Sequence, residues 1–114
     1  MRKSTPETMI CAELFTFSDG REAGFRISGH SGAGEAGYDI VCAAVSSAAY
    51  FVANTITDVI GVKAAISVKD GYMNCKIASE NTEVCKILLK GFRLHLTALS
   101  RQYPQNIQII DTEV

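Results

Sequence analysis

One histidine and one cysteine in the first half of the chain have the types and spacing needed for nucleophilic chemistry. His30 and Cys42 lie twelve residues apart in the stretch GHSGAGEAGYDIVC. A cysteine thiolate is a strong nucleophile. An imidazole, with a reference pKa of about 6.5, can accept a proton in one step and return it in the next. From the residues alone, a buried cysteine and a loop-capping histidine are the simpler interpretation of the same pair.

The predicted start of a helix favours the catalytic interpretation. With Asp39 as the N-cap, a helix over residues 40–59 places Cys42 at the third helical position. Unpaired N–H groups and the helix dipole favour a thiolate there, and the same N–H groups can face the oxyanion of a tetrahedral intermediate. The carboxylate of Asp39 acts in the opposite sense, because a nearby negative charge opposes thiolate formation.

The glycines between the two candidates also form a G-x-G-x-x-G pattern, which is typical of dinucleotide-binding sites. Three features argue against that function. The preceding strand is the second arm of a predicted hairpin, Gly37 is expected before the helix, and the nearest acidic residue, Asp58, falls in a helix. We therefore interpret Gly32, Gly34 and Gly37 as parts of a mobile loop that acts as a lid.

The hydrophobic periodicity predicts one α+β domain with the order ββαββαβ, a mixed sheet packed with two helices. Asp70-Gly71 is a strong signal for a two-residue hairpin turn, and Gly61 suits the end of the first helix. Ser79, Asn81 and Thr82 are candidate N-caps for the second helix. The predicted elements are strands over residues 9–17 and 22–27, a helix over 40–59, strands over 64–69 and 72–77, a helix over 83–103 and a strand over 106–110.

The first of these helices is apolar almost all round. Its uncharged run, residues 40–57, contains serines, threonines and an asparagine, which suits a buried helix better than a membrane span. A helix that hides more than one side needs a second surface besides the sheet. In so short a chain, we expect that surface to come from another copy, and hence a homodimer.

Charge and cysteine usage exclude several classes of function. The 114 residues carry 11 basic and 12 acidic side chains, so direct binding to nucleic acid has little electrostatic support. No signal-peptide pattern opens the chain, and we expect a cytoplasmic protein. Cys11, Cys75 and Cys85 lack metal-site or C-x-x-C spacing and are predicted to be small buried hydrophobes, with no metal or cofactor. His95, the other histidine, falls beside an apolar stripe and is predicted to be structural.

The stretch GHSG…YDIVCAAVS resembles the signature of the ribosomal-processing cysteine proteases, the Prp family. Ser31 stands where many members have alanine. The resemblance extends from Met9 to near the C-terminus, which defines a protease domain over residues 9–114. Residues 1–8 precede the usual family start and are expected to be disordered or a start-site artefact. The matching positions are Gly29-His30, the loop over residues 31–38, Asp39-Ile40-Val41-Cys42-Ala43-Ala44 and Ser46.

The resemblance implies a homodimeric endopeptidase that removes a short N-terminal extension from large-subunit ribosomal protein number twenty-seven. Cys42 is the implied nucleophile, and His30 the implied general base and then acid. Asp39 and Ser46 are implied supporting residues, and Gly29 would set the backbone beside His30. Family substrates present aromatic residues before the cut and a small residue after it, so an apolar cleft is expected near the dyad.

Two other classes of function compete with this one. A non-catalytic ribosome-assembly module would bind the same tail without cutting it. A redox sensor would pair Cys42 with a second thiol and form a defined disulfide under mild peroxide.

Overall fold

The computed structural model describes residues 9–29 and 36–114, and it confirms the predicted order of elements. Two short helical turns, η2 (Thr55–Ile60) and η3 (Ser79–Asn81), adjoin the two long helices. The strands and helices are β1 (Ile10–Thr16), β2 (Glu22–Ser28), α1 (Ala36–Asn54), β3 (Ala64–Lys69), β4 (Tyr72–Ile77), α2 (Thr82–Gln102) and β5 (Ile107–Glu113).

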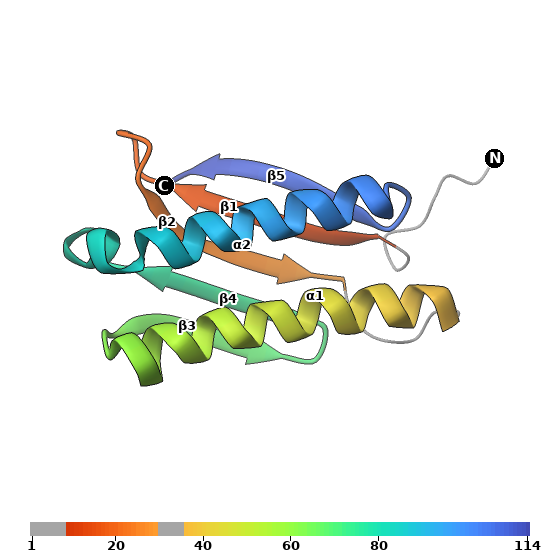
Figure 1. Ribbon diagram of the computed structural model, residues 1–114, viewed down its shortest axis with the longest axis horizontal. Helices are drawn as coiled ribbons and strands as arrows, with labels where there is room; N and C mark the ends of the chain where they lie inside the picture. Colours follow the sequence, from red (N-terminus) through yellow and green to blue (C-terminus); the bar gives the residue numbers. More distant parts are fainter. Residues whose placement is uncertain (1–8, 30–35) are drawn as a thin grey trace.

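The five strands form one mixed sheet in the order β3-β4-β2-β1-β5. β1 and β5 run parallel, whereas the other neighbouring strands run antiparallel. Both helices lie over the same face of the sheet: α2 crosses in front of β1 and β2, and α1 lies beside it on the β4 and β3 side (Figure 1). This two-layer arrangement confirms the predicted α+β class.

The core fills the space between the sheet and the helices. α1 buries side chains at three- and four-residue steps, which is the pattern of a helix that packs through one apolar stripe. Phe25 of β2 and Phe92 of α2 meet edge to face, with ring centroids 4.7 Å apart. Among the most completely buried residues are Ile10, Ile27, Val41, Val45, Ile56, Met73 and Leu96.

The predicted ends of elements are confirmed in two places and wrong in a third. Asp70-Gly71 joins β3 to β4, and Gly61 ends the first helical segment in a left-handed conformation, with φ 83°. The start of α1 was predicted at residue 40, with Asp39 as its N-cap. The helix instead begins at Ala36, so Gly37 and Asp39 lie within its first turn rather than before it.

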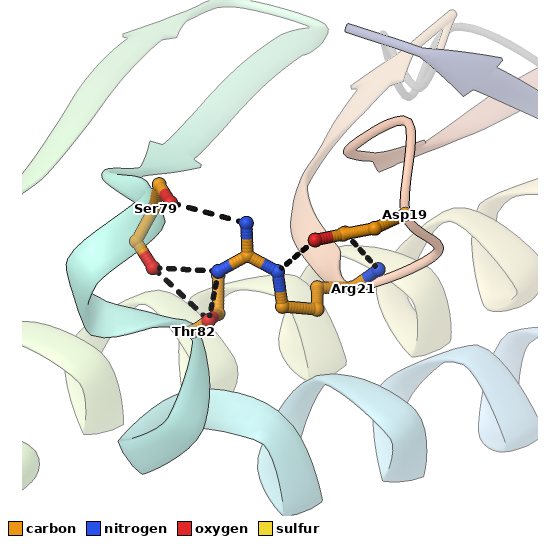
Figure 2. Close-up of polar contacts among 4 residues, drawn as sticks. All are labelled: Asp19, Arg21, Ser79 and Thr82. Atoms are coloured by element: carbon orange, nitrogen blue, oxygen red, sulfur yellow. Dashed lines mark hydrogen bonds and ion pairs between the residues drawn. The ribbon is translucent and has the colours of Figure 1, made fainter.

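The first turn of α2 is stabilised by hydrogen bonds from Arg21, which lies outside the helix, rather than by an N-cap side chain. Asn81 occupies the N-cap position, but it makes no side-chain capping hydrogen bond. Figure 2 shows the alternative: Thr82 Oγ1 donates to the Ser79 carbonyl at 3.0 Å, and Arg21 Nη1 donates to both Thr82 Oγ1 and that carbonyl, at 3.0 and 3.1 Å. Arg21 Nε also donates to Asp19 at 2.7 Å. The β1–β2 turn is thereby tied to the first turn of α2.

A second arginine fixes α2 over the other half of the sheet. Arg93 Nε and Nη2 donate to the two carboxylate oxygens of Glu22, each at 3.0 Å, and Nη1 donates to Asp111 of β5. The hydrogen bonds to Glu22 are the main reason that the pKa of Arg93 is raised, with Asp111 acting in the same sense. This bidentate contact places α2 across β2, β1 and β5 and leaves the β4 side of the sheet to α1.

One helical stretch in the described part of the chain, Ile40–Ile60, is long and apolar enough to cross a membrane by length and composition alone. The core helix of a globular domain satisfies the same test. Val41, Val45 and Ile56 within this stretch are buried in the core, so it packs against the sheet as predicted.

Candidate functional site

Cys42 lies on α1, six residues after the first residue of that helix, Ala36. It belongs to the core cluster with Val41 and Val45, and 6% of its surface is exposed. The helix dipole acts on side chains mainly within the first turn. Because α1 begins earlier than predicted, Cys42 lies in the second turn, and the predicted contribution of the helix start to a thiolate is wrong for this position.

The other half of the predicted dyad lies outside the described residues. His30, Gly32 and Gly34 fall in residues 30–35, and the lid predicted there falls outside with them. Gly37, predicted as part of that loop, belongs to the first turn of α1. The role of Asp39 as a supporting residue stays a prediction, because only its backbone is described.

The backbone that leads to His30 is fixed at Gly29. The N–H of Gly29 donates to the carbonyl of Gly71, 3.1 Å away, which ties the end of β2 to the tip of the β3–β4 hairpin. Gly29 has φ +90°, and a Cβ added there would lie 2.5 Å from the carbonyl oxygen of Met9. Only glycine fits both the dihedral angle and the space. This supports the predicted role of Gly29 in setting the backbone before His30.

The helix geometry separates the two sides of α1. Cys42 and Ala44 are two residues apart, as are Ser46 and Ala48, so the members of each pair point about 200° apart around the helix axis. Ala44 and Ala48 line a groove toward α2. Cys42 and Ser46 therefore share the flank of α1 that faces away from α2, toward the β3 margin of the sheet.

Ser46 is half-buried on this flank, one helical turn after Cys42. Within the described residues, no hydrogen bond from its hydroxyl is found. Thr55 and Thr57, by contrast, each donate to the carbonyl four residues earlier, at 2.7 and 3.2 Å. The hydroxyl of Ser46 is thus not used in the common helix back-bond and can contact a bound molecule.

The groove on the opposite flank of α1 is apolar and has a volume of about 710 Å³. His95 of α2 lies at this groove and is exposed, and its predicted structural role stays a prediction. It also lies across α1 from Cys42. The groove is lined by Ala44, Ser47, Ala48, Phe51, Val52, Ile87, Leu88, Gly91, Phe92 and His95.

The three remaining thiols are held in their neutral form. Burial, with a smaller contribution from Cys85, raises the pKa of Cys75 to about 11. Burial raises the pKa of Cys85. Burial and then Glu13 raise that of Cys11. Cys75 and Cys85 are buried as predicted, whereas Cys11 is half-buried. Within residues 9–29 and 36–114, no three His, Cys, Asp or Glu side chains gather as metal ligands do.

Two of the three predicted arguments against a dinucleotide-binding site are confirmed. β2, which precedes the glycines, is paired antiparallel with β1 and is no part of an opening βαβ unit. Asp58 lies in η2 rather than at the end of a strand. The third argument, that Gly37 precedes the helix, is wrong, because Gly37 lies inside α1. This position alone does not make a phosphate site.

Comparison with known proteins gives a consistent result over most of the chain. A family model described as cysteine protease Prp matches residues 9–108. Two curated relatives from Staphylococcus aureus strains, each named ribosomal processing cysteine protease Prp, are 24% identical over 103 residues, which covers 89% of this chain and 97% of each relative.

Solved structures share the fold. An essential ribosomal processing protease Prp from S. aureus, solved with a substrate peptide, superposes with a TM-score of 0.83 and 23% identity over 91% of this chain and all of that one. A Streptococcus mutans protein superposes with a TM-score of 0.82 and 26% identity, covering 94% of this chain and 97% of that one.

The close contact at Gly29 predicts that alanine lowers the stability more at Gly29 than at Gly20, although both glycines have the same φ. Gly20 also has φ +90°, but a Cβ there would meet nothing within 4 Å. We expect Gly20→Ala to cost about 1 kcal/mol of unfolding free energy, for the left-handed backbone alone. Gly29→Ala should cost about 1–3 kcal/mol more, for the overlap with Met9. Urea unfolding of both variants measures this, and equal losses would contradict the assigned contact.

Proposed function

Because the chain belongs to the cysteine protease Prp family, we propose that it is the endopeptidase that removes the N-terminal extension of large-subunit ribosomal protein number twenty-seven. The observation that carries this proposal is the match of residues 9–108 to the family. That range includes His30 and Cys42, which the resemblance implies as the catalytic dyad. The names of the S. aureus relatives support a ribosomal substrate. A cytoplasmic location follows from that substrate.

The proposed reaction proceeds through a thioester on Cys42. His30 accepts the thiol proton as Sγ attacks the carbonyl carbon of the scissile bond. The tetrahedral intermediate collapses, the peptide C–N bond breaks, and His30 gives its proton to the departing amine. A water molecule then loses a proton to His30 and attacks the thioester, which releases the new carboxylate and regenerates the thiol.

Burial of Cys42 sets a condition on this reaction. With only 6% of Cys42 exposed, a peptide carbonyl reaches Sγ only after neighbouring side chains move. Such a rearrangement commits the enzyme to a bound substrate and keeps water from the thioester until the amine has left. In this proposal Ser46, whose hydroxyl makes no hydrogen bond within the described residues, holds the substrate main chain beside Cys42.

Cleavage should depend on Cys42 and on no other thiol. A synthetic peptide that spans the extension and the cut site is incubated with the protein, and its products are identified by mass spectrometry. Cys42→Ala should lower the cleavage rate at least about 1,000-fold, because the covalent step is lost. Cys11→Ala is the matched control and should retain activity. Persistent cleavage by Cys42→Ala would contradict the assignment, as would a peptide left intact by the unmodified protein.

We also propose that the active form is a homodimer joined through the outer surfaces of α1 and α2. Phe51, Ile87 and Leu94 are large apolar residues that stand exposed on these two helices. They extend the apolar groove between the helices, and a continuous apolar surface of this kind favours association. A second copy of the chain presents the same surface, so the contact is self-complementary in chemistry.

A charge placed on this surface should separate the copies. Leu94→Glu is expected to shift the mass measured by light scattering from that of two chains to that of one, because an interface core disfavours an unpaired carboxylate. Ile110→Glu places the same charge on β5, away from both helices, and should leave the mass unchanged. A dimer that survives Leu94→Glu would show that the copies meet elsewhere.

A further inference from the structure

β3 forms one margin of the sheet. Within residues 9–29 and 36–114 it pairs only with β4, so alternate N–H and C=O groups along its outer side have no partner strand in this part of the chain. Residues 64–68, AAISV, carry no charge. The opposite margin differs, because β5 carries Asp111 and Glu113. Charges near an edge discourage another chain from pairing there, and the uncharged part of β3 has no such protection.

The helix-side face of β3 is uncovered as well as its edge. Ile66 pairs with Cys75, and Val68 pairs with Met73. Because cross-strand partners point to the same face, Ile66 and Val68 point toward the helices. Cys75 and Met73 are buried in the core, yet Ile66 and Val68 are 39% and 48% exposed. The helices therefore leave these two side chains of β3 only partly covered.

The exposure of the helix-side residues of β3 increases along the strand toward the β3–β4 turn. Ala64, at the start of β3, still packs against the core, whereas exposure increases from Ile66 to Val68. The register places Val68 at the level of Met73, and Met73 at the level of Ile27, near the end of β2. From there the chain passes through Gly29 toward the first turns of α1, where Cys42 lies.

The flank of α1 above this margin is the one that carries Cys42 and Ser46. Their positions face away from α2, and β3 is the strand farthest from α2 in the sheet order. The edge of β3, with Ile66 and Val68, therefore lies on the same side of α1 as Cys42 and Ser46. Figure 1 shows α1 along the β3–β4 side of the sheet, with its first turns extending past the β3–β4 turn.

We propose that the edge of β3 is the substrate-binding strand, which pairs with an extended segment of the peptide and takes its apolar side chains against Ile66 and Val68. Main-chain pairing at a free edge binds an extended chain, and pockets at every second residue select side chains. The preferred segment therefore carries apolar residues two positions apart. This inference rests on the proposed function, since the bound segment is that of the substrate.

The test measures the steady-state kinetics of peptide cleavage for Val68→Lys. Its side chain is nearly half exposed, so the fold should persist, and an unchanged thermal unfolding midpoint confirms this. We expect KM to rise about tenfold with kcat unchanged, because an apolar contact that holds the substrate equally before and during reaction is lost. Ile110→Lys is the matched control: Ile110 is 37% exposed on the other edge strand and should behave like the unmodified protein.

Each other outcome has a defined meaning. An unchanged KM for Val68→Lys, with a protein that cuts the peptide normally, overturns the assignment of β3 and leaves the proposed function intact. A fall in mass by light scattering on Val68→Lys also overturns it, because the edge would then join two copies. If the unmodified protein does not cut the tail peptide, the proposed function fails, and this inference fails with it.

Discussion

The position of α1 between α2 and the β3 margin is the constraint on which the rest of the molecule depends. α1 packs on the sheet through one stripe of small and branched side chains, and its rotation about its own axis is set by that stripe. Once the stripe faces the sheet, one flank must meet α2 and the other must face β3. Ser46 falls on the second flank, and Cys42 lies at the margin of the buried stripe on that side. Core packing thus determines where the thiol can be reached.

The charged contacts act at the other half of the sheet, where they hold α2 in place. Arg93 joins α2 to Glu22 and Asp111, and Arg21 joins the β1–β2 turn to the first turn of α2. With α2 fixed over β2, β1 and β5, α1 lies on the β4 and β3 side, and Ile66 and Val68 of β3 stay partly exposed. Contacts distant from the thiol therefore determine which side of the sheet α1 covers.

The element order, the sheet class and the hairpin turns could be predicted from the sequence, because they depend on local signals such as Asp70-Gly71 and on hydrophobic periodicity. The start of α1 could not. Aspartate is a favoured N-cap, but a glycine inside a helix costs only about 1 kcal/mol relative to alanine, so Gly37 does not stop the helix. The exposure of Ile66 and Val68 could not be predicted either, since it depends on which strands the helices cover. The dyad of His30 and Cys42 was predicted from a resemblance to a family rather than from physics alone, and it stays a prediction.

The chemistry is tested most directly by the order in which the four thiols react with iodoacetamide at neutral pH. Alkylation needs the thiolate. The pKa of Cys75 is raised to about 11 and those of Cys11 and Cys85 are also raised, so these three should react slowly. Peptide mapping should show Cys42 modified first, with peptide cleavage lost in proportion to its modification. Alkylation of half-buried Cys11 ahead of Cys42, or full cleavage activity in protein already modified at Cys42, would contradict the account.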